Sequence, residues 1–309
     1  MEKIYFKHAY YLKLGRQGLW EDDLKDGRKA RIGWSDIDIE DILKENWDKI
    51  KGEIEEDYKI RGKKTGATQD FNALQIFCKA TDEDVFITFH YGKLYWCILD
   101  NSDVLQDEIS KFRTTKIRWC STDIKGKSLE ISHISGMITK TQGFRGTLCK
   151  IEELDTLSRI INSEKKPIVE KIEKAKLDLC KFLNAALIEL HPYDFEVLVD
   201  LIFQQSGWRR VSKVGGNMKD FDLELEDPIS KERYKVQVKV SAGLADLKSY
   251  AEDFDGADFH KLFFVVSKPD KTLAVYNNEF ENVQLLTGLG LAELIIDLGL
   301  TNWVLQKIF

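Results

Sequence analysis

Two stretches of alternating apolar and polar residues, joined by a short polar turn, constrain the C-terminal half of this 309-residue chain most strongly. In 221–225 the apolar side chains alternate with acids, which places Asp222 on the polar face of a strand. In 234–240 the valines share one face, and Gln237 and Lys239 lie on the other. The intervening turn predicts that the strands pair as a hairpin, with Asp222 beside Gln237 and Lys239.

A helix is predicted just before this hairpin, at 191–203. Pro192 suits the first helical position, Asp194 places a negative charge in the first turn, and Gly207 ends the segment. The helix is apolar nearly all round, which predicts that it is buried and that Glu196 is an acid in apolar company. We expect Glu196 to lie above the hairpin.

The four polar residues Glu196, Asp222, Gln237 and Lys239 suit metal-dependent hydrolysis of a phosphodiester. Carboxylate and carbonyl oxygens are the ligands that Mg²⁺ prefers. A bound metal polarises the phosphate and generates hydroxide, and a nearby ammonium orients that water or stabilises the developing charge. The same residues also allow a structural interpretation, as a half-solvated strand and a helix acid that pairs with a lysine.

The ordered set resembles a known family. A helical Phe195-Glu196, the loop 215–222 and Gln237-Val238-Lys239 resemble the Mrr-like restriction endonucleases of the PD-(D/E)XK superfamily, over roughly 185–270. In that branch a Gln replaces the second acid of the motif.

The resemblance implies a Mg²⁺-dependent endonuclease of double-stranded DNA, with Mn²⁺ as an alternative ion. It implies that the catalytic residues are Glu196, Asp222, Gln237 and Lys239. It implies that the metal ligands are Asp222, Gln237, Val238 and Glu196. Asp220 is an alternative acid, but Asp222 is preferred because it lies within the alternating strand, opposite the lysine face.

The predicted fold class is α+β, with two domains. Short strand-like runs with turn signals between them, at 84–89, 94–99, 115–120 and 129–132, predict a small barrel in the first half. We expect a β-rich domain at 1–160, a helical linker at 161–184 and an α/β nuclease-like domain at 185–309. The latter is expected to be a helix-covered mixed sheet, with 261–267 as a buried central strand and 272–276 as its neighbour.

The first half also resembles the PUA/EVE-like barrels that precede Mrr-type nucleases in modification-dependent restriction enzymes. The resemblance is carried by Arg31-Ile32-Gly33-Trp34, the strand through Trp96, Arg118-Trp119 and the loop 142–147. It implies a pocket for a flipped, modified base such as a modified cytosine, formed by Trp34, Trp96 and Trp119. The alternative is that these tryptophans belong to the barrel core.

Basic residues predict where phosphates bind. We expect Arg61, Lys63, Lys64 and Arg118 to contact DNA, and the segment from Arg113 to Arg118 more generally. A net charge of −6 argues against wholesale coating of nucleic acid but permits such local patches. A chain with one active site ordinarily needs two copies to cut both strands, which favours a homodimer on DNA.

Five widely spaced cysteines without a Cys-x-x-Cys pair predict reduced thiols and no zinc site. The start of the chain has no signal-peptide core, and no run approaches the ~20 apolar residues of a membrane helix. A cytoplasmic protein is therefore expected. Two function classes stay open: a modification-dependent DNA endonuclease, and a ligand- or partner-gated nuclease effector or nucleic-acid-binding protein in phage defence.

Overall fold

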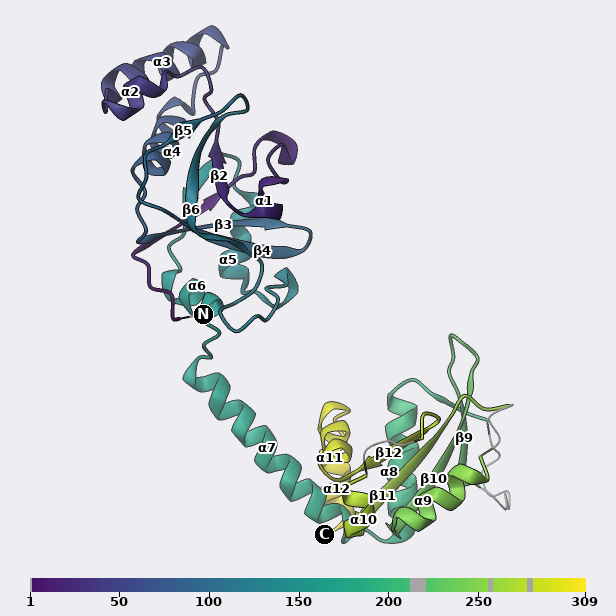
Figure 1. The fold of residues 1–309 in the computed structure, drawn as a ribbon. Helices are drawn as coiled ribbons and strands as arrows, with labels where there is room; N and C mark the ends of the chain where they lie inside the picture. Colours follow the sequence, from purple (N-terminus) through teal and green to yellow (C-terminus); the bar gives the residue numbers. More distant parts are fainter. Residues whose placement is uncertain (1, 212–220, 255–257, 277–279) are drawn as a thin grey trace. The chain divides into compact units, whose positions relative to one another are not determined.

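The computed structural model describes residues 2–211, 221–254, 258–276 and 280–309. The chain forms two compact units, Met1–Lys166 and Pro167–Phe309, each with its own sheet (Figure 1). Each unit also has its own apolar core. The predicted α+β class is confirmed. The predicted linker 161–184 overlaps a long helix, α7, that packs against two helices of the second unit.

The N-terminal unit is built on seven strands. They are β1 (His8–Leu12), β2 (Lys29–Ile32), β3 (Asp84–His90), β4 (Lys93–Leu99), β5 (Leu105–Gln106), β6 (Lys111–Cys120) and β7 (Leu148–Lys150). Its helices are α1 (Asp23–Asp26), α2 (Ile39–Leu43), α3 (Trp47–Ile60), α4 (Ala67–Lys79), α5 (Gly136–Thr139) and α6 (Leu154–Ile161). Short 3₁₀ turns are η1 (Arg16–Gly18), η2 (Ile131–His133) and η3 (Lys140–Gly143).

These strands form one curled, half-barrel sheet in the order β2-β6-β4-β3-β1-β7, with β5 paired to β6. The first strand lies between β3, to which it is parallel, and β7, to which it is antiparallel. Side chains alternate across the sheet, as the two-residue period requires: Phe86 enters one apolar cluster, whereas Val85 and Ile87 enter the cluster on the other side. Both faces are therefore covered.

The strand expected at 129–132 was predicted wrongly. Glu130 forms a single isolated bridge with Lys93, and the chain then turns into η2. Ser135 next caps the short helix α5 by accepting a hydrogen bond from the Met137 amide. One bridge between two turns leaves no length for a strand.

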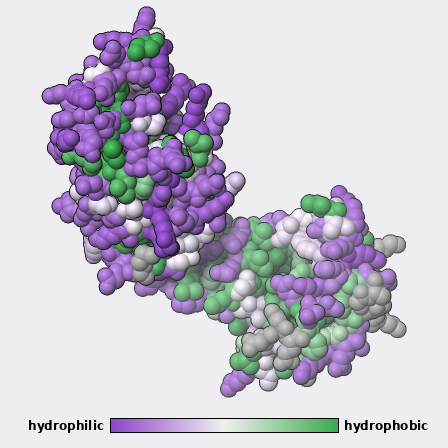
Figure 2. Space-filling model, turned by 45° about the horizontal axis from the view of Figure 1, so that its top comes forward, coloured by the Kyte–Doolittle hydropathy of each residue, from purple (hydrophilic) through white to green (hydrophobic). Residues whose placement is uncertain are grey.

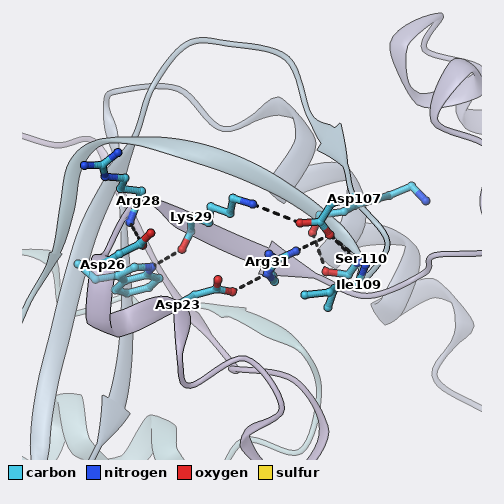
Figure 3. A network of polar contacts seen from close by, with 10 residues as sticks. Asp23, Asp26, Arg28, Lys29, Arg31, Asp107, Ile109 and Ser110 are labelled. Atoms are coloured by element: carbon cyan, nitrogen blue, oxygen red, sulfur yellow. Dashed lines mark hydrogen bonds and ion pairs between the residues drawn. The ribbon is translucent and has the colours of Figure 1, made fainter.

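A buried ion network fixes the edge of this sheet (Figure 3). Arg31 on β2 has a side chain only 4% exposed and donates to Asp23 of α1 and to Asp107, at 2.5 and 2.7 Å. Lys29 donates to the other oxygen of Asp107 at 3.2 Å. Backbone amides of the following turn donate to the Asp107 carboxylate as well. The Arg31 hydrogen bond is the main cause that lowers the pKa of Asp107 well below its usual range.

The C-terminal unit has the mixed sheet that was predicted, and the sheet contains five strands. Its strands, in spatial order, are β12 (Val283–Thr287), β11 (Lys261–Pro269), β10 (Arg233–Ala242), β9 (Leu223–Glu226) and β8 (Arg209–Arg210). The first three are mutually parallel, and β9 and β8 are antiparallel to their neighbours. Its helices are α7 (Pro167–Leu187), α8 (Pro192–Gln205), α9 (Leu244–Glu252), α10 (Lys271–Ala274), α11 (Gly288–Asp297) and α12 (Thr301–Lys307).

Helices cover both faces of this sheet. Val236 and Val238 of β10 face the core formed with α7, α8, α11 and α12, whereas Phe264 and Val266 of β11 belong to the cluster beneath α9. The run 261–267 is the buried central strand that was predicted. The strand expected at 272–276 is instead the short helix α10, because the Asp270 carboxylate accepts the first free amides of that turn.

The visible face of the N-terminal unit is mostly hydrophilic, with apolar residues in small groups (Figure 2). Among the described residues, no single helix is long and apolar enough to cross a membrane. Helices α11 and α12 meet that criterion only when taken together across a bend of 112°.

We predict that Asp107→Asn destabilises the N-terminal unit by about 3 kcal/mol at pH 7, because it leaves a buried guanidinium short of one partner. The folded-state pKa of Asp107 is lowered, so its stabilisation is fully present above the unfolded pKa of about 4 and is lost as the pH falls further. Urea unfolding of both proteins at pH 7 and pH 3 measures the difference. The exposed neighbour variant Glu108→Gln is the control, and equal stability of Asp107→Asn and wild type at pH 7 would contradict the assignment.

Candidate active site and N-terminal cavity

Helix α8 begins as the sequence predicts but is buried on one face only. His191 caps it by accepting a hydrogen bond from the Tyr193 amide, and Pro192 occupies the first turn. Phe195, together with four later apolar residues, faces the core. Glu196 points away from that core and is exposed, which corrects the expectation of a buried acid in apolar company.

The hairpin of β9 and β10 places Asp222 beside the middle of β10. Val236 pairs with Leu223 in the antiparallel register, and the Asp222 amide donates to the Val236 carbonyl at 3.1 Å. One carboxylate oxygen of Asp222, Oδ2, then accepts the Val238 backbone amide at 2.7 Å. The backbone itself therefore sets the position of this acid.

The side chain of Gln237 links the Asp222 carboxylate to the Val238 carbonyl. It is almost fully buried, and its side-chain nitrogen donates to Asp222 Oδ2. The same nitrogen lies 3.4 Å from the Val238 carbonyl oxygen. A single atom thus contacts both the carboxylate and the backbone carbonyl, two oxygens of the kind that Mg²⁺ binds.

Lys239 completes the row on β10. Its side chain is half-buried, and the Asp222 charge acts on it. Its ammonium lies 5.2 Å from the ring centre of Tyr250 on α9, and the interaction with the Tyr250 hydroxyl is the main cause that raises the pKa of Lys239. The lysine is therefore held as a cation next to the oxygen cluster.

The two acids are electrostatically coupled. Asp222 is solvent-exposed as a residue, but its inward-turned oxygen is crowded by β10, and this burial raises the pKa of Asp222 despite its hydrogen bonds. Crowding of the Glu196 carboxyl, followed by the charge of Asp222, raises the pKa of Glu196. The charge of Asp222 thus makes ionisation of Glu196 less favourable, and a cation beside two such carboxyl groups is favourable.

The residues present fit a hard divalent ion. Among the described residues no group of three or more His, Cys, Asp or Glu side chains that could hold a metal is found. Such a group is not required here, because two of the four implied ligands are the Gln237 amide and the Val238 carbonyl. The alternative acid Asp220 and most of the loop 215–222 lie outside the described residues.

The N-terminal unit contains a cavity of about 990 Å³. It lies between the loop after β1, the segment that follows β2, helix α3 and the loop before β7. Aromatic residues in its walls are Tyr11, Trp20, Trp34, Tyr58 and Phe89. The volume is at the upper end of the range of roughly 300–1,000 Å³ typical of ligand pockets.

Only one of the three predicted base-binding tryptophans lines this cavity. Trp34 does, whereas Trp96 is completely buried and donates its ring N–H to the Thr122 carbonyl at 2.9 Å. Trp119 is also buried, with its ring N–H bonded to the Lys29 carbonyl at 2.9 Å. Both are core residues in this structure, since their rings are packed and their polar atoms satisfied.

A buried lysine fixes the wall that carries Trp34. Lys111 is fully buried, and its ammonium donates to the carbonyls of Trp34 at 2.7 Å, Ser35 at 3.3 Å and Ile37. Burial lowers the pKa of Lys111. Trp34 adopts φ 63°, a left-handed conformation that costs a non-glycine residue of order 1–3 kcal/mol, and these hydrogen bonds hold it there.

The predicted DNA-contacting residues divide into two groups. Arg61 and Lys63 are exposed and line the cavity, where Arg61 is paired with Asp57 at 2.8 Å and Lys63 lies over the Tyr58 ring. Lys64 and Arg118 are exposed away from the cavity lining.

Arg113 does not belong with them, which corrects its inclusion among the phosphate contacts. It is 2% exposed, and its guanidinium donates to four backbone carbonyls, three at the end of α4 and one at Asp100. An arginine that caps a helix end from inside the core cannot reach a phosphate.

Two residues of these sites were not identified from the sequence. Trp20 lines the cavity, and Gly15 makes room for its ring: a Cβ added at Gly15 would lie 3.0 Å from it. Tyr250 contacts Lys239. The sequence places Tyr250 on a helix after the Gln-x-Lys strand, but only the parallel packing of β11 brings that helix over the lysine face.

Comparison with known proteins is informative for the second unit. Residues 187–295 match the Mrr catalytic family, described as restriction endonuclease. No curated protein sequence matches the chain. A solved structure titled MspJI restriction endonuclease in complex with a 27-mer oligonucleotide is similar at 13% identity and a TM-score of 0.25, over 80% of this chain and 70% of that chain. At that TM-score the likeness carries no structural inference.

We predict different outcomes for two tryptophans. Trp96→Ala should lower the free energy of unfolding by about 3–5 kcal/mol, because it empties a fully packed core site. Trp34→Ala, at a half-buried cavity wall, should cost about 1–2 kcal/mol or less. Urea unfolding monitored by circular dichroism gives both values. A larger loss for Trp34→Ala than for Trp96→Ala would show that the roles are reversed.

Proposed function

We propose, from the premise that the C-terminal unit carries an Mrr-type restriction endonuclease domain, that the chain is a Mg²⁺-dependent endonuclease of double-stranded DNA. The observation that carries this proposal is the convergence on β10. Asp222, Gln237 and the Val238 carbonyl meet at one point, with the Lys239 ammonium alongside. Hydrolysis of a phosphodiester by a metal ion needs such oxygens to bind the metal and a cation beside them.

The metal would be held by Asp222, the Val238 carbonyl and the Gln237 amide oxygen, with Glu196 adding negative charge. In the structure the Gln237 amide nitrogen faces the two oxygens, so metal binding requires the amide to turn its oxygen inward. When bound, Mg²⁺ supplies Lewis acidity toward the phosphate and toward a water molecule. Mn²⁺ is expected to substitute.

The chain's own residues supply the rest of the chemistry. Val238 holds Asp222 in place through its amide, so that the carboxylate does not reorient as charge develops. Lys239, kept protonated beside Asp222, is placed to orient the attacking water or to stabilise the growing negative charge on the phosphate. The carboxyl of Glu196 increases the local negative potential that attracts the cation.

We further propose that the N-terminal unit selects the substrate by accepting a flipped, modified base in its cavity. Aromatic walls that include Trp34 and Tyr58 support this, because an extruded base stacks between rings and is read at its edge. Tyr58 donates to Asp70 at 2.6 Å, and burial with this bond raises the pKa of Tyr58 to about 12, so it stays a neutral hydroxyl. Arg61 and Lys63 at the same cavity suit the phosphates of the extruded nucleotide.

A second candidate function is a nuclease gated by a small ligand. The observation that favours it is the lining of the cavity, where acids accompany the aromatic and basic residues. The acids are Glu21, Asp36, Glu53, Asp57 and Asp70. Such mixed polar walls suit many small molecules as well as a base. A DNA partner for the catalytic unit is common to both candidates, and so is a homodimer on DNA.

The catalytic assignment predicts that Asp222→Ala abolishes both Mn²⁺ binding and cleavage. Lys239→Ala should keep the metal affinity and lose roughly 10²–10³-fold in turnover, because it removes only charge stabilisation. Calorimetric titration with Mn²⁺ and cleavage of plasmid in Mg²⁺ separate the two variants. Lys235→Ala, on the same strand, is the matched control. If Lys239→Ala weakens metal binding as much as Asp222→Ala, the assigned role of the lysine is wrong.

The base-reading proposal predicts that the intact chain binds a duplex with a modified cytosine more tightly than the matched unmodified duplex. Trp34→Ala should remove most of this preference, since stacking of one base contributes about 1–3 kcal/mol. It should leave the steep salt dependence of general DNA binding unchanged. Trp34→Phe should retain the preference. Equal affinity for both duplexes across several base modifications would reject base reading and favour the ligand-gated candidate.

A further inference from the structure

Tyr250 is packed so that its ring has a fixed position over the active-site strand. It lies on α9, which is anchored by the fully buried Leu247. Its ring contacts Phe221, with centroids 5.9 Å apart, and Phe264, at 5.7 Å. Phe221 directly precedes Asp222, and Phe264 is the register partner of Gln237. Tyr250 therefore touches the neighbours of both polar residues of the proposed metal site.

The same tyrosine holds the Lys239 ammonium. The nitrogen lies 5.2 Å from the centre of the Tyr250 ring, and the Tyr250 hydroxyl is the main cause that raises the pKa of Lys239. Two carboxylates, Asp222 and Asp246, act on the same ammonium electrostatically. Within the described part of the chain, the lysine nevertheless forms no ion pair with either of them. A flexible four-carbon side chain beside two acids would ordinarily pair with one, so another contact must restrain it.

We infer that Tyr250 is a positioning residue for Lys239, whose ring and hydroxyl hold the ammonium beside Asp222 and keep it from pairing with that carboxylate. The inference rests on the proposed function, because it assigns Asp222 to the metal and Lys239 to the phosphate or water. Its consequence is that Tyr250 protects the metal site from an internal competitor. Once freed, the ammonium would occupy the place of the cation.

The inference makes a prediction for metal binding that does not depend on cleavage. Tyr250→Leu should weaken Mn²⁺ binding about two- to fivefold, the coupling expected of a partly exposed ion pair that now competes for Asp222. The double variant Tyr250→Leu with Lys239→Ala should recover the wild-type affinity, since the competitor is gone. If Tyr250→Leu weakened Mn²⁺ binding only by disturbing the structure of α9, removal of Lys239 would not restore the affinity.

The experiment is calorimetric titration of the full chain with Mn²⁺, for wild type, the single variants and the double variant. Tyr276→Phe is the matched control, because Tyr276 packs in the same cluster and its hydroxyl accepts from the Phe280 amide. In parallel, the ε-carbon signal of Lys239 in lysine-labelled protein should carry a ring-current shift that disappears in Tyr250→Leu. Lys239→Arg identifies the signal.

The outcomes separate this inference from the proposed function. Unchanged Mn²⁺ affinity in Tyr250→Leu with an unmoved Lys239 signal overturns the inference alone, as does weakened binding that the double variant fails to restore. Absence of Mn²⁺ binding to the wild-type chain overturns both. If Tyr250→Leu does not fold, Tyr250→Phe decides: proton exchange at the Lys239 ammonium should be several-fold faster than in wild type, and an unchanged rate counts against the inference.

Discussion

The bond between the Asp222 carboxylate and the Val238 backbone amide is the constraint on which the proposed active site depends. The side chain of an aspartate can ordinarily rotate, but the Asp222 carboxylate is held by a backbone amide of the strand that carries Gln237 and Lys239. The register of β9 against β10 sets this contact, and β10 is paired in parallel with β11 on its other side. A one-residue slip of β9 would turn Asp222 to the other face and separate it from Gln237.

The two units differ in how their charged groups are paired. In the N-terminal unit, three buried cations have carboxylates or backbone carbonyls as partners. They are Arg31, Lys111 and Arg113, and their hydrogen bonds hold loops and a helix end in place. In the C-terminal unit, the charged groups around Asp222 are only partly satisfied. Burial raises the pKa of Asp222 and of Glu196, a kind of shift that is frequent at functional sites.

The sequence predicted best those elements whose hydrophobic period agrees with the residues that begin and end them. Helix α8 has both a Pro and a cap, and the hairpin has two clean alternations around an Asp-Pro turn, so the candidate site followed from local rules. The tryptophans show the limit of this approach. Trp34, Trp96 and Trp119 look alike on strand-like segments, and only the curl of the sheet decides that two of them point inward. Likewise nothing in the sequence around Arg113 or Lys111 distinguishes a cation that caps carbonyls from one that meets phosphate, because most of their partners lie more than 30 residues away.

The two ends of the N-terminal unit are tied together. The Ile4 amide donates to the Asn162 side chain at 2.7 Å, and that side chain donates back to the Ile4 carbonyl at 2.9 Å, in a buried pair 158 residues apart. The hydrogen bonds of strand β1 likewise form only with β3 and β7, which come later in the chain. Almost the whole unit must therefore leave the ribosome before its first strand can pair with its neighbours. Such long-range pairing makes folding slow. A fragment that stops at residue 160 would lack the residue that closes the unit, so domain dissection of this chain has to extend past Asn162.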